Sequence, residues 1–283
     1  MVRRVSHPTH GTVTLGGCRP AGPPAHGALR IHLAGYRCTA PSPLPPPLAT
    51  ADYGPGGEVA LRMIDCNDRY GCCTIADLAH GQGVWTGNAS VPPCPATWTD
   101  AQILAAYAAC CPGFDPASGA GDAGCDPTVV MAYACSTGYP DGSKAFGWAV
   151  VDGSSQVEAQ VALDLGEALS VCLGLPDEWI SPFPSADGFT WDVTSEGASP
   201  QNGHCFTAVG YDAEGLIVWS WGLRGHLTWA ALAAYAVPSA GGGLYVRFSA
   251  EQLQAATQRA PGGYDLAQLQ ADLVALQEET AQS

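Results

Sequence analysis

The period at which apolar residues recur changes once along the chain, near Gly166, and this change limits the fold more than any other feature. Before that glycine, four segments carry apolar residues at helical spacing. After it, apolar residues alternate with polar ones, and Asp-Ala-Glu-Gly joins two alternating runs as a hairpin. A chain that forms helices first and mostly antiparallel strands later is typical of an α+β fold.

Several expected elements have clear boundary signals. Thr99 and Gln102 form a capping box before one helix. Asp126 precedes Pro127 at the start of the next, and Ser155 begins the last helix before the change of period. We expect helices at 73–85, 100–111, 127–137, 155–166 and 228–236, and strands at 28–33, 169–173, 204–211, 216–221 and 244–248.

Prolines divide the chain into an arm and a body. Ten of the 23 prolines lie in the first 55 residues, and the stretch 39–57 is too rich in proline for a helix interior or a central strand. We therefore expect a Pro-rich basic arm or linker at 1–57 and a folded domain at 58–250. A C-terminal helical tail is expected at 251–283, because its leucines share one helical face between 264 and 280.

The net charge of −15 combines a basic arm with an acidic body. The chain before Asp52 carries five arginines, no lysine and no acidic residue. The rest has 6 basic and 26 acidic residues, which gives a net charge of −20. Such a body repels phosphate, so no nucleic acid is expected as a partner. The chain also lacks the run of about 18 apolar residues that would predict a membrane span.

Twelve cysteines could form disulfides in a secreted protein, but the first 50 residues contain no apolar segment of the kind a signal peptide needs. No two cysteines have Cys-x-x-Cys spacing, and the pair His7 and His10 is typical of a loop rather than of a metal site. We therefore expect no metal or cofactor, and most thiols should be small core residues. One or two disulfides stay open, and the residues fix neither their pairing nor the compartment.

Two short segments carry the residue types of thiol catalysis. Asn-Asp-Arg-Tyr-Gly-Cys-Cys-Thr at 67–74 lies where a loop enters a helix, and the dipole at a helix N-terminus stabilises a thiolate. Asn-Gly-His-Cys-Phe at 202–206 enters a strand. A histidine beside the cysteine would form the thiolate–imidazolium pair that makes a nucleophile at neutral pH. Cys73 and His204 are 131 residues apart.

With these motifs the chain resembles the papain-like cysteine peptidases, and most closely a group of papain-like proteins encoded by bacteria and their phages. The ordered set carries the resemblance: NDRYGCCT, NGHCFTAVGYD at 202–212, Trp221-Gly222, a Thr-Trp-Ala block at 228–230 and a tail at 260–269. Together these matches cover roughly residues 60–280. The resemblance implies a helical part followed by an antiparallel β part, and acyl transfer through a thioester intermediate.

The resemblance also implies three site residues. Cys73 matches the nucleophile, and His204 matches the general base. Asn67, six residues before Cys73, matches the side-chain amide that helps to stabilise the oxyanion. Each position has a structural alternative, because Cys73 and His204 could be buried core residues and Asn67 could simply hold its own turn. Five further residues are expected to belong to an ordinary helix or to core packing: Asp77, His80, Trp219, Trp221 and Trp229.

Four positions differ from the family pattern or bear on it. Cys72 replaces an aspartate, so two adjacent thiols compete, and the register favours Cys73 as nucleophile. Thr74 replaces an aromatic residue. Trp219 stands at the position of the orienting asparagine and offers no acceptor to an imidazole N–H. Strand alternation directs Ser220 away from the face of Trp219, so we expect a Cys–His dyad or an acceptor from elsewhere, such as a backbone carbonyl.

Two functions fit these residues. The first is a papain-like thiol hydrolase, a peptidase or amidase that acts on a peptide or amide substrate. The alternative is a structural or accessory protein of a phage virion that reuses the fold. In that case residues 1–57 and the C-terminal helix would dock on neighbouring subunits or on copies of the chain. A vicinal disulfide between Cys72 and Cys73 that masks the nucleophile under oxidation is a further hypothesis.

Overall fold

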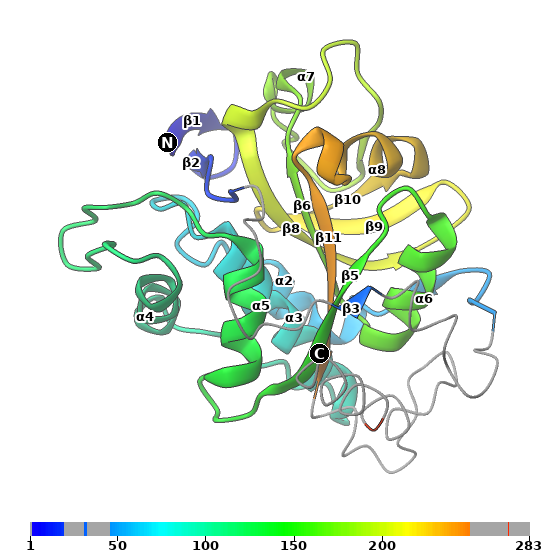
Figure 1. The fold of residues 1–283 in the computed structure, drawn as a ribbon, viewed down its shortest axis with the longest axis horizontal. Coiled ribbons are helices and arrows are strands. Elements are labelled where there is room, and N and C mark those ends of the chain that lie inside the picture. Colours follow the sequence, from blue (N-terminus) through cyan, green and yellow to red (C-terminus); the bar gives the residue numbers. More distant parts are fainter. Residues whose placement is uncertain (1, 20–30, 33–45, 250–270, 272–283) are drawn as a thin grey trace, which may run out of the picture.

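The computed structural model describes residues 2–19, 31–32, 46–249 and 271 (Figure 1). Its helices are α2 (Glu58–Leu61), α3 (Cys73–Ala89), α4 (Asp100–Cys110), α5 (Pro127–Ser136), α6 (Gln156–Gly166), α7 (Asp177–Ile180) and α8 (Trp229–Tyr235). Three short 3-10 turns are η1 (Pro55–Gly57), η2 (Pro200–Asn202) and η3 (Pro238–Ala240). None of these helices is both long enough and apolar enough to cross a membrane.

The strands form a hairpin and one large sheet. Their bounds are β1 (Arg3–His7), β2 (Gly11–Leu15), β3 (Ile31–His32), β4 (Ala51–Asp52), β5 (Ala145–Val151), β6 (Leu169–Gly174), β7 (Phe189–Trp191), β8 (Gly203–Tyr211), β9 (Gly215–Ser220), β10 (Leu223–Thr228) and β11 (Gly243–Ser249). The sheet has the order β3-β5-β11-β6-β8-β9-β10-β7, and β4 pairs with β8. Its pairs are antiparallel except β3–β5 and β7–β10. The α+β prediction is therefore confirmed.

Two hydrophobic cores lie on the two sides of helix α3. The larger core joins the sheet to α6 and α8, and it contains residues such as Val161, Phe206 and Leu232. The other holds α3 against α4 and α5, with Trp85 and Tyr107 almost fully buried. Helix α3 also packs on β8, so it lies between the helical part of the molecule and the sheet (Figure 1). Its first residue therefore faces the sheet.

The described N-terminal part of the arm, residues 2–19, forms a hairpin on the body of the same chain, whereas the end of the arm supplies β4 to the main sheet. Strands β1 and β2 pair antiparallel, and Val13 and Leu15 of β2 are fully buried in the larger core. Figure 1 shows this hairpin at the edge where the helices meet the sheet. The sequence predicts no strand before residue 28, because Gly, His and Pro interrupt the alternation in this segment.

The helix caps agree with their sequence signals. Both halves of the Thr99 capping box are present, and the Asp126 side chain accepts a hydrogen bond in the first turn of α5. Ser155 accepts from the backbone N–H of Glu158, but the Glu158 carboxylate accepts from the N–H of Asp152, so that box is only half formed. The caps depend on local contacts, which is why short patterns predict them.

Several strands were missed. The sequence pattern does not show β5, because its apolar residues are continuous rather than alternating. Strands β7 and β10 lie at one end of the sheet and are short or polar, so they carry little apolar signal. Of the strand expected at 28–33, the structure describes β3 at Ile31–His32. The helix expected at 264–280 lies outside the described residues.

Candidate active site

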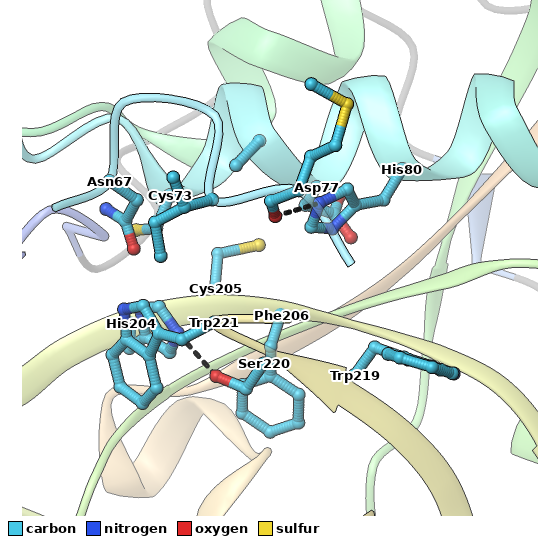
Figure 2. Close-up of a pocket in the computed structure, with 13 residues that line it drawn as sticks. Asn67, Cys73, Asp77, His80, His204, Cys205, Phe206, Trp219, Ser220 and Trp221 are labelled. Carbon is cyan, nitrogen blue, oxygen red and sulfur yellow. Dashed lines mark hydrogen bonds between the residues drawn. The ribbon is translucent and has the colours of Figure 1, made fainter. Parts of the chain in front are cut away.

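The three site residues predicted from the sequence line one small pocket between helix α3 and strands β8 and β9 (Figure 2). Asn67 and Cys73 lie on the helix side, and His204 lies opposite them on the strand side. The cavity between them has a volume of about 10 Å³, which is enough for about one water molecule. The fold thus brings the three residues together around a cavity too small for a substrate.

The imidazole of His204 is held on one edge and on one face. Its Nε2 lies 3.0 Å from the hydroxyl oxygen of Ser220. The Trp221 ring stacks on it, with 4.0 Å between ring centroids and 10° between planes. Its Nδ1 is buried and has no hydrogen-bond partner among the described residues. The ring is therefore fixed in orientation, while one nitrogen stays available to take a proton.

The expectation that Ser220 cannot orient the histidine is wrong. Strand β9 pairs with β8 so that Trp219 is opposite Thr207 and shares its face of the sheet. Thr207 is an odd number of residues from His204, so the two side chains point to opposite faces. Trp219 therefore lies on the face away from His204, and Ser220 lies on the same face as His204. The serine hydroxyl supplies the contact that the sequence seemed to lack.

The sequence predicts that Trp221 belongs to core packing, but Trp221 also lines the pocket. It follows the end of β9 with a φ of 48°, a left-handed conformation that is uncommon for a bulky residue. Because this turn interrupts the alternation of the strand, the Trp221 ring folds back onto the imidazole instead of continuing the pattern set by Trp219. No short-range sequence signal marks such a turn, apart from the Gly222 that follows it with a φ of 75°.

Cys73 begins helix α3 and is buried, with 1% of its surface exposed. Burial, and after it the neighbouring thiols of Cys18 and Cys205, raises the pKa of Cys73 well above its ordinary value. The adjacent Cys72 is turned into the preceding loop, where its thiol donates to the carbonyl oxygen of Asp65 at 3.3 Å. Of the two neighbouring thiols, only that of Cys73 lines the pocket.

Asn67 holds its own turn and also lines the pocket. Its side-chain nitrogen donates to the carbonyl oxygen of Tyr70 at 3.1 Å, so it holds its own turn. It is also 3% exposed and lines the pocket beside Cys73. A side-chain amide has two N–H groups, so one hydrogen remains for a ligand in the pocket after the turn is made.

Two buried ion pairs lie beside the pocket, at residues expected to be ordinary. The Asp77 carboxylate is 2.9 Å from the guanidinium of Arg247, and the imidazole Nε2 of His80 is 3.1 Å from the carboxylate of Asp65. Burial opposes the charged form of His80, but the hydrogen bond and charge of Asp65 outweigh it and raise its pKa. Burial, followed by the charge of His80, lowers the pKa of His204 to about 3. The sequence signal for these ion pairs is weak, because it consists of two polar residues, Asp77 and His80, three positions apart in an otherwise apolar helix.

The N-terminal segment contacts the backbone on both sides of the pocket. The N–H groups of Gly16 and Cys18 donate to the carbonyl oxygen of Gly203, next to His204, at 2.9 and 3.3 Å. On the other side, the carbonyl of Gly17 accepts from the N–H of Cys125 at 2.8 Å. A Cβ atom on Gly17 would lie 2.5 Å from the carbonyl oxygen of Gly71, so the segment is in backbone contact with the loop before Cys73. Residues 16–18 therefore bridge the two walls of the site.

The hairpin before this segment attaches to the same region. The imidazole of His7 packs on the rings of Phe183 and Trp221, with 5.0 and 5.8 Å between centroids. His10 Nε2 is 2.7 Å from the carbonyl oxygen of Trp221. The N–H of Thr14 donates to the carbonyl oxygen of Asn67 at 3.0 Å. The hairpin thus contacts the backbone of two site residues.

The described cysteines are free thiols, and Cys38 lies outside the described residues. Most of them are buried, as the sequence predicts, although Cys94 is exposed. Cys72 and Cys73 are not joined to each other. Within the part of the chain that the structure describes, no group of three or more histidine, cysteine or acidic side chains is placed to hold a metal ion.

Solved structures of other proteins share this architecture, although no protein-family model and no curated protein sequence matches the chain. The chain is similar to xylellain, a cysteine protease from Xylella fastidiosa, with a TM-score of 0.56 and 12% identity over 87% of this chain and 97% of that one. It is also similar to the digestive procathepsin L2 proteinase of the Tenebrio molitor larval midgut. That match has a TM-score of 0.54 and 13% identity over 83% of this chain and 78% of the other. At these identities the likeness concerns the fold, and the chain therefore has the papain-like α+β fold.

Proposed function

We propose that this protein is a thiol hydrolase that cleaves amide bonds in peptides, and that its N-terminal segment holds the site closed. The observation that carries the proposal is the environment of His204. Its Nε2 is bonded to Ser220, and its Nδ1 lies without a partner in the pocket that Cys73 lines. A buried imidazole with one oriented edge and one unpaired nitrogen is arranged to exchange a proton with a neighbouring thiol.

The reaction follows from these positions. His204 takes the proton of the Cys73 thiol, and the thiolate attacks the carbonyl carbon of the substrate. The N–H of Cys73, which has no partner within its helix, and the second amide hydrogen of Asn67 stabilise the oxyanion. The imidazolium then gives its proton to the leaving amine, which leaves a thioester on Cys73. Water, deprotonated by His204, hydrolyses the thioester and restores the thiol.

The closed form is a resting state in this account. A raised pKa for the Cys73 thiol and a pKa of about 3 for His204 keep both groups neutral near pH 7. Burial is the first cause of both shifts, and the N-terminal segment contributes to it. When the segment leaves, water enters and the thiolate–imidazolium pair becomes accessible.

A peptide is favoured as substrate because the site already binds one. Residues 17–19 run beside it after a bend at Gly16, and main-chain hydrogen bonds hold this segment: Gly16 and Cys18 to Gly203, and Gly17 and Arg19 with Cys125. Main-chain bonds of this kind do not depend on the side chains of the bound segment. A substrate peptide that replaces the arm could use the same carbonyl and N–H groups.

A non-catalytic protein that reuses the fold is the second candidate, because the covered pocket would suit it as well. The described part of the arm docks on its own chain, and none of the comparisons supports the virion version of this hypothesis. The two candidates differ in what opening the pocket does. Opening produces a hydrolase in the first case and only an exposed thiol in the second.

Gly17→Leu tests the proposal, because a leucine side chain cannot fit against the carbonyl of Gly71 and should displace the segment. We expect this variant to hydrolyse peptides from a mixed fluorogenic library, whereas the wild-type chain is slow. Adding Cys73→Ala should abolish the activity, and adding Cys72→Ala should leave most of it. Ser6→Leu, at an exposed position of the same arm, is the matched control for the opening. If Gly17→Leu releases the arm but cleaves nothing, or if both cysteine variants behave alike, the proposal is wrong.

A further inference from the structure

Thiols of the arm and of the body meet beside the candidate site. Cys172 in β6 and Cys205 in β8 face each other across the sheet, with 3.2 Å between their sulfur atoms. Cys18, which belongs to the arm, adjoins Cys172, because after burial its thiol is the largest cause of the raised pKa of Cys172. These three cysteines pack in one cluster with Cys73. The chain thus places a thiol of its covering segment in contact with a thiol of the wall below it.

Among Cys18, Cys73, Cys172 and Cys205, Cys18 is the one that a solute reaches. It lines a groove with a volume of about 570 Å³, together with Gly174, Gly203 and Tyr235. The other thiols of the cluster do not line this groove. Cys18 is also 7% exposed, whereas Cys73, Cys172 and Cys205 are only 1–3% exposed. A small disulfide in the groove would therefore meet Cys18 first.

We propose that Cys18 is a site of thiol–disulfide exchange and that Cys172 is its partner, so that oxidation ties the arm covalently over the pocket. The co-reactant is a small disulfide of the glutathione type. The Cys18 thiolate attacks it, forms a mixed disulfide and releases one thiolate. Cys172 then attacks the sulfur of Cys18, a second small thiol leaves with the proton of Cys172, and a Cys18–Cys172 disulfide remains. Two thiols are oxidised, and one disulfide is reduced to two thiols.

The position of Cys172 decides between the possible partners. Its sulfur lies 3.2 Å from that of Cys205, and Cys18 is the neighbour that raises its pKa most, whereas Cys18 acts on the pKa of Cys73 through charge alone. A disulfide between Cys172 and Cys205 would compete with the Cys18–Cys172 disulfide, because it would consume the Cys172 thiol and leave the arm without a covalent link to the body. The consequence for hydrolysis rests on the proposed function, but the covalent tie does not.

The test uses the full chain and oxidised glutathione. After incubation, free thiols are alkylated and the disulfides are mapped by mass spectrometry, and we expect a peptide that links Cys18 to Cys172. Alkylation of Cys73 by iodoacetamide over long times at neutral pH should slow at least about tenfold in the oxidised protein, because the open form is no longer populated. Dithiothreitol should restore the original rate.

Variants distinguish the Cys18–Cys172 disulfide from oxidation of other thiols. Cys18→Ser should remove both the link and the slowing, and Cys172→Ser should leave glutathione bound to Cys18. Cys94→Ser, which removes an exposed thiol elsewhere, should change neither. A Cys172–Cys205 link, a Cys18–Cys73 link or an unchanged rate at Cys73 would overturn the inference. Absence of hydrolysis in reduced and oxidised protein alike would count against the proposed function only, because neither mapping nor alkylation needs it.

Discussion

The position of the His204 imidazole depends on two side chains that follow each other in the chain. Trp221 covers one face of the ring, and Ser220 accepts or donates at Nε2. Stacking restricts tilt but leaves rotation within the plane of the ring free, so the hydrogen bond is the contact that directs Nδ1. A serine hydroxyl rotates and is neutral, so it orients the ring without stabilising imidazolium as a carboxylate would.

Ser220→Ala should therefore lower kcat more than it raises KM. In the Gly17→Leu background we expect about a tenfold loss of kcat/KM, which corresponds to the roughly 1.4 kcal/mol of one buried hydrogen bond. Ser220→Thr should restore most of the rate because it returns the hydroxyl, and the melting temperatures should stay close together. Ser239→Ala on the surface serves as the control. An equal loss with the threonine variant would mean that Ser220 acts through packing alone.

At this scale the sequence predicts which residue types form the site but not how they are oriented. The motif around Cys73 and the distance to His204 indicate that the two meet, because both follow from the fold that the motifs imply. The choice of Ser220 depends on the register that sets Trp219 opposite Thr207, which is a long-range pairing. No local sequence pattern near Ser220 indicates how β9 is paired with β8.

At the scale of elements, helix α3 is joined to the sheet by charge as well as by apolar packing. Arg247 of β11 bonds the Asp77 carboxylate and the Asp77 carbonyl oxygen at 2.9 and 3.1 Å. Ser170 of β6 and Thr207 of β8 also donate to that carboxylate, at 2.5 and 2.8 Å. Three strands thus bond one side chain of the helix that begins at the nucleophile.

Arg247→Met should destabilise the fold strongly, because it leaves the Asp77 carboxylate buried and unpaired. We expect a loss of about 3 to 5 kcal/mol in the free energy of unfolding, measured by urea denaturation. The double variant Asp77→Leu, Arg247→Met should recover most of it, since no charge is left alone. Arg62→Met, which removes two half-exposed ion pairs, with Glu58 and Asp187, should cost about 1 kcal/mol or less. Similar losses for the two single variants would contradict this view.

The elements that the sequence predicts well are those with local signals. Capped helices such as α4 and α5 and the strands of the β8–β9 hairpin appear at the expected positions. Strand β10 pairs with the adjacent β9, but its own sequence lacks alternation. Strand β5 also lacks alternation, and it depends on β11, a neighbour far away in the chain. The buried pair of Asp77 and Arg247 was missed for the same reason, because its two residues are 170 positions apart.

At the scale of the whole molecule, the arm and the body form one closed unit, and a histidine of the arm makes this closure sensitive to acid. Backbone N–H groups of Thr9 and His10 donate to His7 Nδ1, so the hairpin turn that places the His7 ring on Phe183 and Trp221 requires that nitrogen to be unprotonated. Burial, followed by the charge of His10, lowers the pKa of His7 from 6.5 to about 4. In a released arm the pKa of His7 would return to 6.5. Between the two pKa values His7 therefore binds a proton in the released arm but not in the docked arm.

Docking of the arm should accordingly weaken as the pH falls below 6.5 and be weakest below about 4, with a total loss of about 3 kcal/mol. Hydrogen exchange at the amides of Gly16 and Cys18, corrected for the intrinsic effect of pH, reports the opening. In His7→Phe the ring contacts remain but the titration is lost, so the dependence on pH should flatten. His226→Gln, a histidine outside the arm, should leave it unchanged, and the same dependence in His7→Phe would exclude His7 as the sensor.

The arm also shows how far composition predicts architecture. A Pro-rich basic segment joined to an acidic body is visible in the sequence, and that contrast indicates a segment with its own task. Where the segment docks depends on the match between its backbone at Gly16 and Gly17 and two loops that are distant in sequence. Nothing in the composition of the arm specifies those loops.

In the proposed mechanism, Cys73 is a reactive thiol covered by the arm of its own chain. The most direct test of this mechanism is the rate constant for alkylation of Cys73 by iodoacetamide, separated from the other thiols by peptide mapping. In Gly17→Leu this rate should exceed that of the wild-type chain and of Ser6→Leu by at least about tenfold, since opening raises the accessible fraction. It should also exceed the rate of the exposed Cys94. Equal rates for Cys73 in the three chains, or a Cys73 slower than Cys94 in Gly17→Leu, would contradict the account.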